Sequence, residues 1–139
     1  MSTAVSLGDI VKMFRVFKNR WFDRWARREG ISDQSLVSAA KEIVSGKVDA
    51  DLGGYLFKKR MARPGGGKRG GYRTIVGYKS TGPEHVIFLY AFAKNAKANI
   101  SLREEAALSL AAASFLSAPE KKLDEFLLRG SIIEVKQDE

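Results

Sequence analysis

Cations concentrate in the middle of this chain. Between Leu52 and Pro83 the sequence contains eight lysines and arginines and no aspartate or glutamate, while the rest of the chain has 16 cations and 16 acids. The whole net charge of +8 therefore comes from this stretch. Such a concentration is the electrostatic footprint of a site for a polyanion, although charge alone fits a solvated sheet face with its counterions equally well. The eight cations are Lys58, Lys59, Arg60, Arg63, Lys68, Arg69, Arg73 and Lys79.

Two motifs in or near this stretch suggest other chemistry. The run from Gly65 to Lys68 is glycine-rich like a phosphate-binding loop, but Arg69 stands where such a loop needs Ser or Thr for magnesium, and no helical pattern follows. We expect instead a hairpin connection whose glycines keep Lys68 and Arg69 mobile. The only histidine, His85, has no acidic or thiol partner at a fixed spacing, which favours an ordinary polar residue over a general base.

Most of the large aromatic residues are candidates for the core, and two tyrosines are candidates for binding a base. Tyr72 and Tyr90 can stack on an unpaired base, although packing inward on a sheet competes for both rings. The other large aromatic side chains follow helix or strand periodicity and are expected in the core. These core candidates are Trp21, Trp25, Phe88 and Phe115.

Composition limits the class of protein. The 139 residues, 45% of them hydrophobic and 29% charged, predict one globular domain over residues 1–139, with residues 1–12 flexible. No cysteine and a single histidine exclude a disulfide framework or a thiolate metal site, so neither metal nor other cofactor is expected. Residues 1–8 lack the features of a secretory signal and residues 86–93 are too short to cross a bilayer, which predicts a cytoplasmic protein with no membrane contact.

The cationic stretch requires strands to position it. Residues 55–62, 72–78 and 86–93 are rich in aromatic and β-branched side chains and are separated by Gly and Pro clusters, which predicts a small antiparallel meander. The third run is apolar throughout, as in a central strand covered on both faces. Helices must therefore pack on both sides of the sheet.

The flanking segments supply those helices. Residues 13–17 are typical of a short strand, and residues 20–28 have an apolar helical stripe that ends at Gly30. A second helix can begin at Ser32 or Asp33 and stop at Gly46. A Ser-x-x-Glu capping box at Ser101 begins a long helix, and residues 118–139 add a shorter helix and a strand over residues 132–135. The fold class is α+β, with two N-terminal helices and the C-terminal helices packed on the sheet.

Three motifs together resemble those of the RelE/ParE superfamily of bacterial toxins. They are residues 52–63, residues 67–74 with their Gly-Tyr-Arg-Thr strand, and the Phe92-Ala93-Lys94 element. The resemblance covers nearly the whole chain and is closest to the RelE-like, HigB-type branch. It implies a RelE/ParE-like fold and a toxin of a type II toxin-antitoxin system. Such toxins are held inactive by a cognate antitoxin protein, which is expected here to be of helix-turn-helix type.

The activity that this resemblance implies is cleavage of translated mRNA, on the ribosome or free, which blocks protein synthesis. In such toxins a ribose 2′-hydroxyl of the substrate attacks, so the protein must orient the strand and stabilise a charge-rich phosphorane. Guanidinium groups suit that task and make Arg60 and Arg73 the leading candidates, followed by Lys58 and Lys94 in proton transfer. The residues expected to bind RNA are Lys59, Arg63, Lys68, Arg69, Tyr72 and Lys97.

The chain departs from the family pattern at one position. Asn95 stands where members of the family often have an arginine, and Lys97 is the nearest substitute. Two further functions stay open. One is a non-cleaving inhibitor of DNA gyrase like those of the ParE branch, and the other is a catalytically silent module that binds RNA or an antitoxin.

Overall fold

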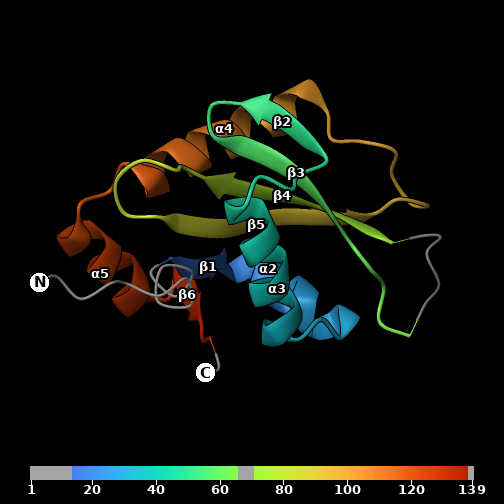
Figure 1. Cartoon of the computed structure of the whole chain (residues 1–139), viewed down its shortest axis with the longest axis horizontal. Coiled ribbons are helices and arrows are strands. Elements are labelled where there is room, and N and C mark those ends of the chain that lie inside the picture. Colours follow the sequence, from blue (N-terminus) through green and yellow to red (C-terminus); the bar gives the residue numbers. More distant parts are fainter. Residues whose placement is uncertain (1–13, 66–70, 138–139) are drawn as a thin grey trace, which may run out of the picture.

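The computed structural model describes residues 14–65 and 71–137 (Figure 1). The predicted flexible residues 1–12, and the predicted mobile cations Lys68 and Arg69, lie outside the described residues. In chain order the elements are β1 (Arg15–Asn19), α2 (Arg20–Glu29), α3 (Asp33–Val44), β2 (Ala50–Gly53), β3 (Leu56–Met61), β4 (Tyr72–Tyr78), β5 (His85–Ala93), α4 (Leu102–Leu116), α5 (Glu120–Arg129) and β6 (Ile132–Val135). In the described part of the chain, no helix has the length and apolar character needed to cross a membrane.

One six-stranded sheet runs through the molecule in the order β2-β3-β4-β5-β1-β6. The predicted antiparallel meander of β3, β4 and β5 is confirmed. The sheet as a whole is mixed rather than purely antiparallel, because β1 pairs with β5 in parallel, with Arg15 opposite His85. Parallel neighbours need a long crossover between them, and here two helices and three strands separate β1 from β5 in the chain.

Helices cover both faces of this sheet (Figure 1). One core cluster joins α2 and α3 to one face through residues such as Phe22 and Phe88, and the other joins α4 and α5 to the opposite face through residues such as Ile87 and Phe115. Gly77 lets α4 approach β4 closely, since a Cβ atom there would lie 3.1 Å from the Cβ atom of Ala112. The prediction of an α+β fold with a central strand covered on both sides is confirmed.

The predicted helix boundaries are confirmed where a side chain caps the helix. The carboxamide oxygen of Asn19 accepts a hydrogen bond of 2.7 Å from the backbone N–H of Phe22 and begins α2. Ser101 forms the complete capping box with Glu104 at the start of α4. Gly30 ends α2 in the left-handed conformation, with φ at 73°.

The fold differs from the sequence-based expectations at Trp21 and at strand β2. Trp21 is not in the core, because 43% of its surface is exposed, whereas Trp25, Phe88 and Phe115 are buried as expected. Strand β2 was not predicted, because its four residues include none of the β-branched or aromatic types that indicate a strand. It becomes a strand by pairing with β3, with Ala50 opposite Lys58.

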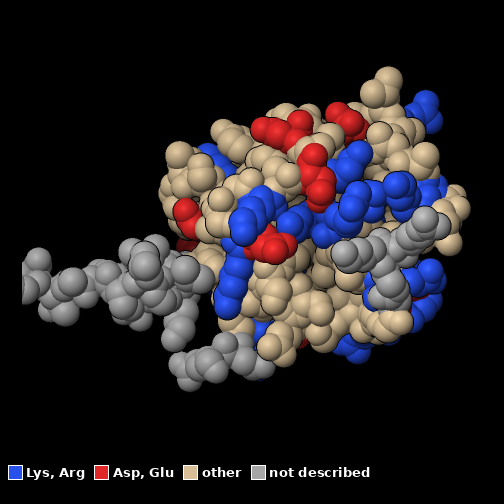
Figure 2. Space-filling view, turned by 45° about the vertical axis from the view of Figure 1, so that its right-hand side comes forward, with Lys and Arg blue, Asp and Glu red and all other residues tan. Residues whose placement is uncertain are grey.

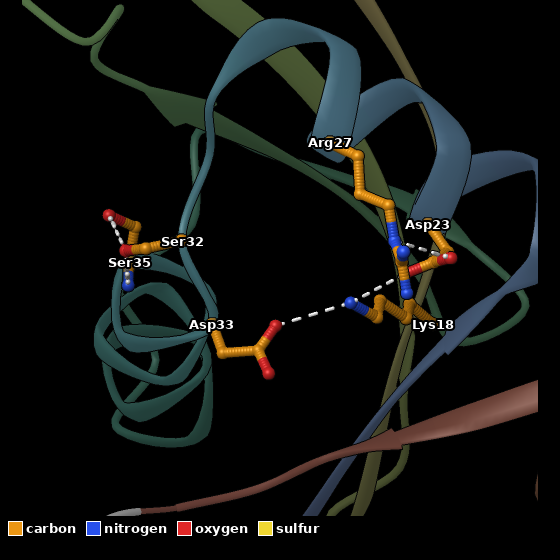
Figure 3. A network of polar contacts seen from close by, with 6 residues as sticks. All are labelled: Lys18, Asp23, Arg27, Ser32, Asp33 and Ser35. Carbon is orange, nitrogen blue, oxygen red and sulfur yellow. Dashed lines mark hydrogen bonds and ion pairs between the residues drawn. The ribbon is translucent and has the colours of Figure 1, made fainter.

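An ion-pair network centred on the buried side chains of Lys18 and Asp23 links β1, α2 and α3 (Figure 3). We use this name for Lys18, Asp23, Arg27 and Asp33. The Nζ atom of Lys18 lies 2.8 Å from Oδ1 of Asp23 and 3.2 Å from Oδ1 of Asp33. Burial by itself raises the pKa of Asp23, but the hydrogen bond and charge of Lys18, together with those of Arg27, bring that pKa below its ordinary value. The network therefore holds both α2 and α3 against the sheet through one nearly buried lysine.

Candidate functional site

The register of the meander brings the leading candidate residues together. Arg60 on β3 lies directly opposite Arg73 on β4. Lys58 precedes Arg60 by two residues on the same strand, so its side chain leaves the sheet on the same face. Further along, this face carries Leu56 and Ile75 and is covered by α4. We call Lys58, Arg60 and Arg73 the cationic face.

Two like charges in directly opposed positions are unfavourable for the sheet. Within residues 14–65 and 71–137 the guanidinium groups of Arg60, which is exposed, and of Arg73, which is half-buried, form no ion pair with a carboxylate. The carboxylate of Asp49 accepts a hydrogen bond from the backbone N–H of Arg60, not from its guanidinium group. A local conflict that the fold itself does not resolve is expected at functional sites. An anion such as phosphate would relieve this one, since guanidinium groups bind phosphate oxygens bidentately.

The two candidate lysines occupy different settings beside the arginines. The Nζ atom of Lys58 donates a hydrogen bond of 3.0 Å to Oδ1 of Asn99, in the loop before α4, which positions the ammonium group. Sequence reasoning missed Asn99, because 41 residues separate it from Lys58 and no motif marks it. Lys94 is exposed and follows β5 directly, where its backbone N–H bonds to the carbonyl of Gly71. The strand register thus places it at the same end of the sheet as Arg73.

Two aromatic side chains of β5 continue this face of the sheet. Phe92 lies opposite Arg73 and Tyr90 opposite Ile75. The Nζ atom of Lys97 lies 5.3 Å from the centre of the Tyr90 ring and 2.5 Å from a carboxylate oxygen of Glu104. The hydrogen bond that Lys97 donates to Glu104 raises the pKa of Lys97, and the same bond is the main cause that lowers the pKa of Glu104 to about 2. Lys97 is therefore a cation already paired with a carboxylate, which reduces its value as a substitute for the missing arginine.

The remaining predicted RNA-binding residues divide by burial. Lys59 is only 9% exposed and points to the other face, where its Nζ atom lies 2.7 Å from Oε1 of Glu42. Tyr72 is 2% exposed, and its hydroxyl donates a 2.6 Å hydrogen bond to Glu29. Both side chains have partners within the fold in this conformation, and their contact with RNA stays a prediction. Arg63 is exposed, with its guanidinium 5.7 Å from the centre of the Tyr72 ring.

His85 lies apart from the cationic face. It begins β5, and Phe92 is seven residues further along the same strand, roughly 23 Å away at strand spacing. Its ring packs edge-on against Phe17, with 5.3 Å between ring centres, and burial followed by the charge of Arg15 lowers its pKa. Among residues 14–65 and 71–137, no three His, Cys, Asp or Glu side chains come together as a metal site.

Lysine and arginine side chains form a band across one side of the molecule (Figure 2). This side comes forward from the right of Figure 1, where β4 begins and β5 ends. Acidic side chains border the band mainly on its left and upper sides. Strand register and alternation place Lys58, Arg60 and Arg73 of the acid-free stretch on one face, whereas Lys59 of the same stretch points to the other face.

The fold and this surface define a small α+β protein with a cationic sheet face at the end of the meander where β4 begins and β5 ends. A family model described as the RelE toxin of the RelE/RelB toxin-antitoxin system matches residues 14–135. The chain belongs to this RelE toxin family, whose members have an antitoxin as partner. A comparison with curated proteins finds no significant match.

Proposed function

We propose that this toxin is an endoribonuclease that cleaves translated mRNA in the cytoplasm and so blocks protein synthesis. The observation that carries the proposal is the opposition of Arg60 and Arg73, whose guanidinium groups form no ion pair with a described carboxylate and which share one face with Lys58. A polyanion is the ligand that this arrangement suits best. Membership of the RelE family supports the choice of RNA.

The chemistry needs little from the protein beyond positive charge and positioning. The 2′-hydroxyl of one nucleotide loses its proton and attacks the neighbouring phosphorus, and the 5′-oxygen of the next nucleotide leaves and gains a proton. The products are a 2′,3′-cyclic phosphate and a 5′-hydroxyl. Arg60 and Arg73 would stabilise the extra negative charge of the phosphorane. Lys58 and Lys94 are the candidates for the two proton transfers, and the reaction as written uses no metal.

Primer extension on a reporter mRNA, with and without ribosomes, tests this proposal. Arg73→Ala should reduce cleavage by about 10²- to 10³-fold, the usual effect of removing one group that stabilises a developing oxyanion. Lys79→Ala is the matched control, because Lys79 belongs to the same acid-free stretch but follows the far end of β4. Equal cleavage by wild type and Arg73→Ala would refute the proposed site. If the cleavage products appear only when ribosomes are present, the activity depends on ribosomes.

A second candidate is a non-cleaving module that binds RNA. Asn95 stands at the position where the family often has an arginine, and the nearby Lys97 is paired with Glu104. In this case binding to RNA would fall steeply with salt while primer extension showed no new ends. A gyrase inhibitor like those of the ParE branch would instead block supercoiling by purified gyrase, and nothing in the described structure favours it.

The partner and the branch of the family belong to the same proposal. We expect an antitoxin of helix-turn-helix type that masks the cationic face with acidic residues, as a partner of a toxin of the HigB-type branch. The neighbouring open reading frame tests both expectations. A partner without a helix-turn-helix segment would contradict them.

A further inference from the structure

Trp21 is exposed where its helical pattern predicts burial. Asn19 ends β1 and begins α2, and its side-chain amide also donates a 2.9 Å hydrogen bond to the carbonyl of Leu89 on β5. Since β1 pairs with β5 only as far as Phe88, the last part of β5 has no strand beside it there. Helix α2 passes this edge and leaves Trp21 43% exposed, while Trp25, one turn later, is only 6% exposed.

The exposed indole continues the surface that carries the cationic face. Its ring centre lies 4.7 Å from that of Tyr90, at an angle of 30° between the planes. Tyr90 and Phe92 are 6.2 Å apart between ring centres, and Phe92 is the cross-strand partner of Arg73. Direct neighbours therefore connect Arg60 and Arg73 to Trp21 across the sheet and around its edge.

Arginines flank Trp21 on α2. Arg24 follows Trp21 by three residues and Arg20 by four, so Arg24 is a helix-surface neighbour of both, and Arg20 directly precedes Trp21 in the chain. Both arginines are exposed, and neither has an acidic partner in the part of the chain that the structure describes, whereas Arg27 pairs with Asp23 and Arg28 with Glu29. An exposed aromatic ring beside unpaired cations is the combination by which proteins bind single-stranded nucleic acid.

We propose that Trp21 is a stacking site for an unpaired base of the RNA, with Arg20 and Arg24 binding the adjacent phosphates. This inference rests on the proposed function, because the same strand would cross the cationic face. A protein partner is less well matched, since a docking helix needs apolar neighbours around the tryptophan, and the exposed leucines of the described chain belong to α4 and α5.

A binding titration separates this site from the cleavage chemistry. The full chain is titrated with a short single-stranded 2′-O-methyl RNA, which lacks the free 2′-hydroxyl and cannot be cleaved by the proposed route. Trp21→Ala should weaken binding about tenfold, within the range for loss of one base–aromatic stack. Trp21→Phe should retain most of the affinity, because phenylalanine also offers a ring. Leu128→Ala, which removes an exposed apolar side chain from α5, is the control and should bind like wild type.

Intrinsic fluorescence adds a readout that a merely structural role would not change. The chain has two tryptophans, and Trp25 is buried. RNA binding should quench wild-type fluorescence, and Trp21→Phe should lose that quench while it still binds. Circular dichroism confirms that each variant is folded.

Several results would overturn the inference. If Trp21→Ala binds the oligonucleotide like wild type while Arg73→Ala does not, the stacking site is wrong and the RNA-binding face stands. If wild type does not bind the oligonucleotide at all, the stacking site is wrong, and primer extension with and without ribosomes decides separately whether the chain cleaves mRNA. If Trp21→Ala binds RNA normally but changes the sedimentation of the chain from dimer to monomer, Trp21 belongs to a protein interface instead.

Discussion

Lys59 and Arg60 are consecutive residues of β3, yet the structure gives them opposite surroundings. Lys59 is nearly buried beside α3 and pairs with Glu42, whereas Arg60 is exposed and faces Arg73. The same contrast separates the ion-pair network around Lys18 from the cationic face as a whole. Cations that hold the fold together have carboxylate partners, and those left without partners are available for a ligand.

The largest effect should come from removing a cation that is nearly buried and paired with carboxylates. Lys18→Met removes a cation that is 7% exposed and leaves the nearly buried Asp23 with only Arg27 as partner. We expect the free energy of unfolding to fall by about 3 kcal/mol, near the lower end for removing one partner of a buried ion pair. Urea denaturation measures this change, with the exposed Asp124→Ala as control. An unchanged urea midpoint would show that the network contributes no stability.

The two neighbours on β3 allow the sharpest comparison. Lys59→Met should lower the free energy of unfolding by about 1 kcal/mol, because Glu42 stays exposed to water, and should leave mRNA cleavage intact. Arg60→Ala should reduce cleavage by about 10²-fold. It should not lower stability, because it removes one of two opposed like charges, which cost about 0.5 kcal/mol. If both variants lost stability and neither lost cleavage, the division into structural and ligand-binding cations would be wrong.

A paired cation can be converted into an unpaired one. Glu104→Gln removes the carboxylate that holds Lys97 but keeps a residue able to complete the capping box with Ser101. Affinity for the 2′-O-methyl RNA should rise about threefold, and the salt dependence should steepen by about 0.7 in the logarithmic slope for one added phosphate contact. Glu105→Gln makes the same change in net charge and should have less effect, since Glu105 has no ion pair in the described chain. Equal effects of the two variants would indicate net charge rather than release of Lys97.

The pH dependence of stability should show the smallest of these effects. Because the pKa of Asp23 is lower in the folded chain than in the unfolded chain, its contribution is complete above the unfolded pKa of about 4 and is lost as the pH falls through the folded value. Asp23→Asn cannot titrate, so its urea midpoint should fall less steeply than that of wild type between pH 5 and pH 3. Identical slopes would mean that Asp23 titrates alike in both states.

Much of the fold could be predicted from local sequence. Strand β4 and strand β6 have the predicted bounds, and the caps at Ser32, Ser101 and Gly30 mark the helix ends. The parallel placement of β1 beside β5 could not be predicted, because nothing near Val16 specifies a partner about 70 residues away. The exposure of Trp21 escaped prediction for a related reason, since helical spacing does not show where a neighbouring strand ends.

The candidate site was predictable as a segment but not as a surface. The sequence alone determined that positive charge lies in an acid-free stretch between turns, because charge and turn propensity are properties of the residues themselves. Which of those cations are paired within the fold and which are left without a carboxylate partner was decided by the tertiary structure, through strand register and through carboxylates brought from distant helices. Because side chains alternate along β3, Lys59 lies on the face that packs against α3 and Arg60 lies on the opposite face. Only the packing of α3 and the pairing with β4 bring Glu42 to Lys59 and Arg73 opposite Arg60.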